Sequence, residues 1–215
     1  MQEPRFAPAG PNAATRRAPS PATPDRPIAA PARMRVRYPE AFPDGFRLMS
    51  LPPPDFEHKL CPPEALAERV AALPRPLVFT NGCFDILHRG HVTCLARARA
   101  LGAALVVALN TDASVRRLGK GDDRPINPLA DRLAVIAALG CVDLVTWFDD
   151  DTPRATLLTC HPDVLVKGGD WPVEAIVGAA EVTAWGGRVQ AIPFEHERST
   201  TRLLDTIRHG QKPPE

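Results

Sequence analysis

The amino-acid sequence predicts an α/β fold in which an open parallel sheet of about five strands is covered by helices on both faces. From Leu77 onward, short apolar runs alternate with segments of helical periodicity, which is the pattern of right-handed β–α–β crossovers. The strand candidates are also continuously apolar, as strands are when both faces of their sheet are covered. Together these observations predict a Rossmann-like sheet.

The strand candidates are the short apolar runs of the chain, beginning with "LVFTN". Each is bounded by polar or glycine-containing segments that can form turns. The expected strands are residues 77–81, 104–111, 142–148, 163–168 and 188–194.

The helix candidates lie between these strands. A helix at 91–102 places Val92, Leu95 and Ala96 on one face, and a helix at 128–140 begins with proline and ends on glycine, as helices prefer. A helix packed ahead of the first strand is expected at 62–73 ("PPEALAERVAAL"). Further helices are expected at 152–160, 173–179 and 199–210.

The composition excludes several classes of protein. The 215 residues, with a formal charge of +1, suffice for one domain of ordinary size, which we place at 60–210. Residues 49–215 carry 18 basic and 21 acidic groups, and this slightly acidic balance argues against a nucleic-acid binder. No apolar run approaches the roughly 20 residues that cross a membrane. Five scattered cysteines without CxxC spacing indicate reduced thiols in a cytoplasmic protein.

Residues 1–48 form a Pro/Ala/Arg-rich extension that we expect to be disordered. They hold ten of the 25 prolines, eight Arg and four Asp/Glu, so neither a helix nor a sheet ladder is favoured. The prolines also argue against a transit peptide, which needs an amphipathic helix. Met34 or Met49 is an alternative start, and we expect no function upstream.

The segment "FTNGCFDILHRGH" (79–91) predicts a phosphate site. Ligands of open parallel sheets bind beyond the carboxyl ends of the strands, near the point where strand order reverses. Gly82 lets the backbone turn with its amides exposed, and a helix that begins near Gly90 points free N–H groups at an anion. His88 and His91 add side-chain donors beside these amides.

Other interpretations of this turn remain open. The two histidines could simply cap the helix, or Cys83, Asp85, His88 and His91 could bind zinc, although two histidines three apart lack a clear third ligand. Asp85 could orient a histidine or the turn rather than act as a base. Cys83 could act as a nucleophile, which would need a partner base and a covalent intermediate, or it could contribute only its amide.

The turn resembles the HxGH motif of the cytidylyltransferase-like nucleotidyltransferase superfamily, whose members join a nucleoside triphosphate to a phosphorylated small molecule. Together with four further blocks it resembles the D-glycero-β-D-manno-heptose 1-phosphate adenylyltransferases of lipopolysaccharide synthesis. In order and spacing the resemblance covers nearly all of residues 60–209. The further blocks are "NTDASVRRLGKGDDRPIN" (110–127), "DTPRATL" (151–157), "PDVLVKGGDW" (162–171) and "ERSTTRLLDTI" (197–207).

The resemblance implies transfer of AMP from ATP to the sugar 1-phosphate with release of pyrophosphate, assisted by Mg²⁺. No protein nucleophile is then required, so catalysis rests on positioning and on neutralising phosphate charge. A separate heptose kinase would supply the sugar phosphate, and a homodimer is compatible with the resemblance.

The resemblance also implies which residues form the site. We expect four residues to act on the reacting phosphates: His88, His91, Lys120 and Arg198. Residues expected to bind the nucleotide are Asn81, Gly82, Cys83, Phe84, Gly90, Asn110, Asp112, Arg124, Lys167, Gly169, Asp170, Ser199, Thr200 and Thr201. Asp170 is also the candidate to contact Mg²⁺ through water.

Several of these residues have more than one interpretation. Asp112 could accept hydrogen bonds from ribose or could cap the helix of "DASVRRL". Arg124 could reach a phosphate from its basic loop. Lys167 could contact the nucleotide or the sugar. Ser199 is a natural cap for a helix start that would point at an anion.

Two other functions fit the same sequence. One is a cytidylyltransferase of the superfamily that acts on glycerol 3-phosphate or a similar small phosphate, and the other is a catalytically inactive nucleotide-binding regulator. A class I aminoacyl-tRNA synthetase also carries an HxGH-type motif, but no KMSKS-like loop or tRNA-binding domain fits in this length.

Overall fold

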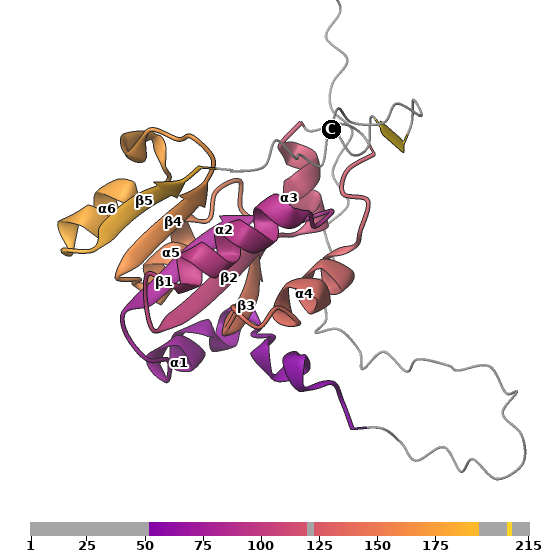
Figure 1. Cartoon of the computed structure of the whole chain (residues 1–215), viewed down its shortest axis with the longest axis horizontal. Coiled ribbons are helices and arrows are strands. Elements are labelled where there is room, and N and C mark those ends of the chain that lie inside the picture. The colour runs from indigo at the N-terminus through magenta and orange to yellow at the C-terminus, as the bar shows by residue number, and fades with distance from the viewer. Residues whose placement is uncertain (1–51, 120–122, 194–205, 208–215) are drawn as a thin grey trace, which may run out of the picture. The chain divides into compact units, whose positions relative to one another are not determined.

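Five parallel strands form the centre of the domain (Figure 1). The structure, a computed structural model, describes residues 52–119, 123–193 and 206–207. The strands are β1 (Leu77–Gly82), β2 (Ala104–Asn110), β3 (Leu144–Phe148), β4 (Val164–Gly168) and β5 (Arg188–Ile192). Each predicted strand is confirmed to within two residues at either end.

The strand order is β3-β2-β1-β4-β5. β1 pairs in parallel with β2 on one side and with β4 on the other, with Phe79 opposite Val106 and opposite Leu165. The order runs away from β1 in both directions, so the point of reversal lies between β1 and β4. All seven residues of β2 are buried, which explains why the strand reads as an unbroken apolar run.

Helices cover both faces of this sheet, as predicted. In Figure 1, α2 (Arg89–Arg99) and α4 (Leu129–Ala137) lie over the near face. They pack there against alternate strand residues such as Val78, Leu105 and Val107. The opposite face packs against α1 (Leu66–Ala71), α5 (Arg154–Cys160) and α6 (Ala179–Ala184).

The chain ahead of β1 belongs to the domain. It forms two 3₁₀ turns, η1 (Asp55–Lys59) and η2 (Pro63–Ala65), followed by α1, so the predicted helix at 62–73 is divided. Between the two turns, the Cys61 amide donates to the Val145 carbonyl at 2.8 Å, which attaches this segment to the outer side of β3.

Another helix also differs from the prediction. The segment expected as a helix at 173–179 is a 3₁₀ turn, η3 (Val173–Ala175), and α6 starts only at Ala179. The reason is Gly178, which has φ 91° and approaches Leu157 so closely that a Cβ would lie 2.8 Å from its side chain. A short helix, α3 (Asp112–Arg117), follows β2 directly.

Some expectations lie outside the described residues. These are the disordered extension at 1–48 and nearly all of the helix at 199–210. Within the described part of the chain, no helix is long and apolar enough to cross a membrane.

Candidate active site

The turn after β1 begins at Gly82, beside the ring of Phe84. A Cβ on Gly82 would lie 3.0 Å from that ring, so the glycine lets the backbone and the aromatic ring lie close together. Phe84 itself has φ 45°, a left-handed conformation that is uncommon for a residue other than glycine. Such backbone conformations concentrate at ligand sites, where surrounding contacts hold them in place.

His88 and His91 are brought together at the start of α2. His88 is the N-cap residue and His91 lies in the first turn, and their rings stack with centroids 3.8 Å apart. Phe84 meets the ring of His91 edge-on at 5.4 Å. The two imidazoles therefore form one rigid unit at the positive end of a helix of 11 residues.

Burial lowers the pKa of His88 below its ordinary value, which favours the neutral imidazole. Its Nδ1 atom is buried and has no hydrogen-bond partner among the described residues. The Nε2 atom is thus the nitrogen that can reach a ligand, and in the neutral ring it can carry the proton and donate.

The side chain of Asp85 holds the turn in place. The residue is 3% exposed, and its carboxylate accepts from the amides of Ile126 and Asn127 at 2.9 and 2.8 Å, and from Arg124 Nε at 2.5 Å. Burial by itself would raise the pKa of Asp85, but these hydrogen bonds and the Arg124 charge outweigh it, so the pKa is lowered. The loop before α4 is thereby attached to the turn between β1 and α2, the predicted phosphate turn.

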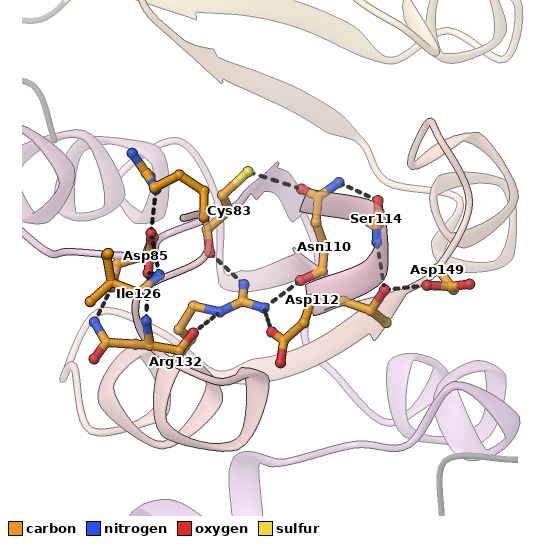
Figure 2. A network of polar contacts seen from close by, with 11 residues as sticks. Cys83, Asp85, Asn110, Asp112, Ser114, Ile126, Arg132 and Asp149 are labelled. Atoms are coloured by element: carbon orange, nitrogen blue, oxygen red, sulfur yellow. Dashed lines mark hydrogen bonds and ion pairs between the residues drawn. The ribbon is translucent and has the colours of Figure 1, made fainter. Parts of the chain in front are cut away.

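Arg132 of α4 is the largest fully buried side chain of the described residues. Figure 2 shows its guanidinium between the ends of two strands. It donates to the carbonyls of Cys83 at 2.7 Å and Asn110 at 2.9 Å, and to Asp112 Oδ1 at 2.6 Å. The Cys83 and Asn110 carbonyls stand where β1 and β2 end.

The polar residues that follow β2 are tied to one another. Asn110 donates through Nδ2 to Ser114 Oγ at 2.9 Å, and its Oδ1 lies 3.7 Å from Cys83 Sγ. The N-cap of α3 is Thr111, whose hydroxyl accepts from the Ser114 amide at 3.1 Å and donates to Asp149. The expectation that Asp112 could cap this helix is therefore wrong. Asp112 is the first residue of α3 and pairs with Arg132.

The end of β4 faces the end of β1, where the strand order reverses. Lys167 Nζ donates to Asn81 Oδ1 at 3.3 Å across the two strands. Gly169 has φ 108°, and its amide donates to the Ile192 carbonyl at 2.8 Å. Asp170 is exposed just beyond this turn.

The structure therefore brings the described candidates from β1, β2 and β4 to one edge of the sheet. Those of the first turn are Asn81, Gly82, Cys83, Phe84, His88, Gly90 and His91; those of the later segments are Asn110, Asp112, Arg124, Lys167, Gly169 and Asp170. Arg124 pairs with Asp85 and is 7% exposed. The remaining candidates, Lys120, Arg198, Ser199, Thr200 and Thr201, lie outside the described residues.

Sequence reasoning missed Arg132, Thr111 and Asn127. A signal for Arg132 was present, because it lies four residues before Ile136 on the buried stripe of its helix, where a lone arginine needs a partner. The zinc alternative loses its ligand set, since Asp85 is occupied by amides and Arg124. In the part of the chain that the structure describes, no three His, Cys, Asp or Glu side chains are arranged to hold a metal.

Fold and site together define an α/β protein in which a turn bearing two stacked histidines leaves β1 at the point of strand reversal. The cytidylyltransferase-like family matches residues 79–203, and the chain belongs to this family. It is therefore a nucleotidyltransferase.

Relatives carry more specific names. Over 157 residues the chain is 60% identical to the D-beta-D-heptose 1-phosphate adenylyltransferase of Bordetella bronchiseptica, a match that covers 72% of this chain and 97% of that protein. Over 135 residues it is 56% identical to the bifunctional protein HldE of Hahella chejuensis, covering 63% of this chain but only 28% of HldE. A solved lipopolysaccharide core biosynthesis protein from Thermoplasma volcanium is 30% identical, with a TM-score of 0.47, over 57% of this chain and 98% of that one.

Proposed function

We propose that this protein transfers AMP from ATP to D-glycero-β-D-manno-heptose 1-phosphate, giving ADP-heptose and pyrophosphate for lipopolysaccharide core synthesis. The observation that carries the proposal is the stacked pair His88–His91 at the start of α2, beside the turn that leaves β1. The name of the Bordetella relative supports the choice of substrates.

In the proposed reaction, a phosphate oxygen of the sugar 1-phosphate attacks the α-phosphorus of ATP. The bond from that phosphorus to the bridging oxygen breaks, and pyrophosphate leaves in line. The residues of the turn need supply no covalent bond; they hold the triphosphate and stabilise charge that develops on its oxygens. His88 and His91 donate to these oxygens, together with the turn amides and the amino end of α2.

The other candidates have proposed roles around this centre. Asp112, with Oδ1 held by Arg132, can accept from the ribose hydroxyls, while Asn110 borders the nucleoside. Lys167, at the point of strand reversal, faces the incoming sugar phosphate. Beyond the described residues, Lys120 and Arg198 would add charge at the phosphates, and the segment Ser199–Thr201 would add hydroxyls and amides.

Mg²⁺ would enter with ATP, held chiefly by the phosphates, as this ion prefers. Asp170 fits that arrangement, because its exposed carboxylate stands at the carboxyl edge of the sheet, where it can contact the ion through water. The ion would neutralise triphosphate charge. We further propose that the reaction takes place in the cytoplasm and that a separate kinase supplies the sugar 1-phosphate.

The test is a substrate profile. The protein is incubated with Mg²⁺ and each combination of ATP or CTP with the heptose 1-phosphate or glycerol 3-phosphate, and pyrophosphate release is measured, with reactions lacking acceptor as controls. Release should require ATP and the heptose 1-phosphate together. Release only with CTP and glycerol 3-phosphate would favour the cytidylyltransferase alternative, and no release in any combination would refute an active transferase.

A further inference from the structure

Arg132 stands in a position that is unfavourable for a cation unless specific partners hold it. The residue is 1% exposed, and arginine is rarely buried so completely without paired groups. It also ends the first turn of α4, where the helix dipole disfavours positive charge. Its partners must therefore account for its presence.

Those partners belong to three separate segments. Nη1 binds the Cys83 carbonyl of the phosphate turn, and Nη2 binds both the Asn110 carbonyl at the end of β2 and the Asp112 carboxylate of α3. Nε binds the Asn127 carbonyl at 3.0 Å, in the loop that also holds Asp85. One planar group thus fixes the relative positions of all these segments (Figure 2).

The bond to Cys83 also sets the direction of the next amide. In a trans peptide, the C=O and the following N–H point to opposite sides of one plane. When the Cys83 carbonyl points at Arg132, the Phe84 N–H points away from it. The β1–β2 ladder runs only as far as Gly82 and Leu109, so strand pairing does not hold this peptide.

We propose that Arg132 is a positioning residue for nucleotide binding: it holds the phosphate turn and Asp112 in one frame, so that the triphosphate and the ribose of one ATP are bound together. This proposal rests on the proposed function. Arg132 acts through Cys83 and Asp112 and does not touch the nucleotide.

Replacement by lysine is the informative change. Arg132→Lys retains the positive charge, but an ammonium group donates from a single point and does not reproduce the planar fork that reaches four acceptors. A matched control is Arg99→Lys, because Arg99 also binds a carbonyl (Gly102, 2.7 Å) and a carboxylate (Asp143, 2.8 Å), but beside the amino end of β2.

The experiment measures kcat and both KM values by pyrophosphate release, and the Kd of ATP by calorimetry, on protein whose folded fraction is known from circular dichroism. For Arg132→Lys we expect kcat/KM for ATP to fall roughly 100-fold, with a weaker Kd, while KM for the sugar phosphate stays unchanged. Arg99→Lys should leave kcat, both KM values and the Kd of ATP near the wild-type values. Asp112→Asn should weaken ATP binding in the same direction and lose little more when combined with Arg132→Lys.

A purely structural role predicts another pattern. Partial unfolding of Arg132→Lys would lower the apparent kcat in proportion to the folded fraction, with both KM values and the Kd of ATP unchanged, and that result would overturn the proposal. If Arg132→Lys does not fold, Asp112→Asn with unchanged ATP affinity would overturn it as well. If the wild type binds ATP but transfers nothing, the proposed function has failed, and the Kd values alone decide the role of Arg132.

Discussion

At the residue scale, the phosphate turn depends on two titratable groups, the half-buried His88 and the buried Asp85, whose pKa values are lowered for different reasons. Burial penalises the charged form of His88 and lowers its pKa, which favours the neutral imidazole. Asp85 is buried too, but amide hydrogen bonds and Arg124 stabilise its charged form. The turn therefore combines an imidazole that can donate with a carboxylate that stays ionised and holds the backbone in place.

The neutral state of His88 predicts that acid destabilises the fold. As pH decreases below the ordinary histidine pKa of 6.5, His88 takes up a proton in the unfolded chain before it does so in the folded protein. The unfolded state then holds more protons, so the free energy of unfolding decreases as pH decreases. His88→Asn should remove this contribution. Urea unfolding at about pH 7.5 and about pH 5.5 should show a smaller loss for the variant than for the wild type.

Asp85 does not affect this comparison. Its contribution to the free energy of unfolding is lost only below the ordinary aspartate pKa of 3.8, as pH falls through its lowered pKa. An equal loss of stability in the wild type and in His88→Asn would contradict the assigned state of the ring.

Only part of the site could be predicted from single residues. His88, His91 and Gly82 were predicted because the glycine–histidine pattern is local and its chemistry follows from a strand–turn–helix context. Three partners of Arg132, Cys83, Asn110 and Asp112, lie 20 to 49 residues away in sequence, and no local pattern specifies them. Arg124 was expected at a phosphate from its charge and from the family resemblance, whereas its side chain in this structure pairs with Asp85.

At the element scale, the connection from α2 to β2 fixes how β1 and β2 align. The Pro76 carbonyl accepts from the Ala103 amide at 2.7 Å, and Gly102 passes directly over it. A Cβ on Gly102 would lie 2.4 Å from that carbonyl oxygen, a backbone atom that cannot move aside cheaply. The strand register that brings Cys83 and Asn110 to the same edge thus depends on a glycine at position 102.

Gly102→Ala should destabilise the protein by roughly 1–3 kcal/mol, the usual cost of an overpacked contact. The matched control is Gly140→Ala, because a Cβ there meets nothing within 4 Å and should leave stability unchanged or raise it by up to about 1 kcal/mol. Both values come from urea unfolding. Equal stability of the two variants would mean that the contact at Gly102 relaxes without cost.

Elements could be predicted from the sequence where packing and propensity agree. The strands are mostly apolar and bounded by turn residues, so their limits were predicted to within two residues. Only β5 alternates, with Arg188 and Gln190 exposed. The helix at 173–179 was wrong because Val173 and Val177 are exposed and Gly178 takes a positive φ, a requirement set by contact with Leu157. The only sign of such a tertiary constraint in the sequence is the glycine itself.

At the scale of the whole domain, strand order decides where the chemistry can occur. With the order β3-β2-β1-β4-β5, the ends of β2, β1 and β4 are adjacent, so residues from three distant segments meet at one edge. Because all five strands are parallel, their carboxyl ends lie at the same edge of the sheet, which is why the edge that carries the site could be predicted before its contacts. The central claim is that ATP binds there by its phosphates, against the histidine pair.

The most direct test is kcat/KM for ATP in His88→Asn and His91→Asn. The control is His161→Asn, since His161 also stacks on an aromatic ring, that of Trp185 at 4.1 Å, but precedes β4 at the amino edge of the sheet. Its left-handed φ of 44° suits asparagine. We predict a fall of roughly 100- to 1000-fold in each of the first two variants, with folding retained, and wild-type activity in the third. Values for folded His88→Asn and His91→Asn within about a factor of three of wild type would contradict the account.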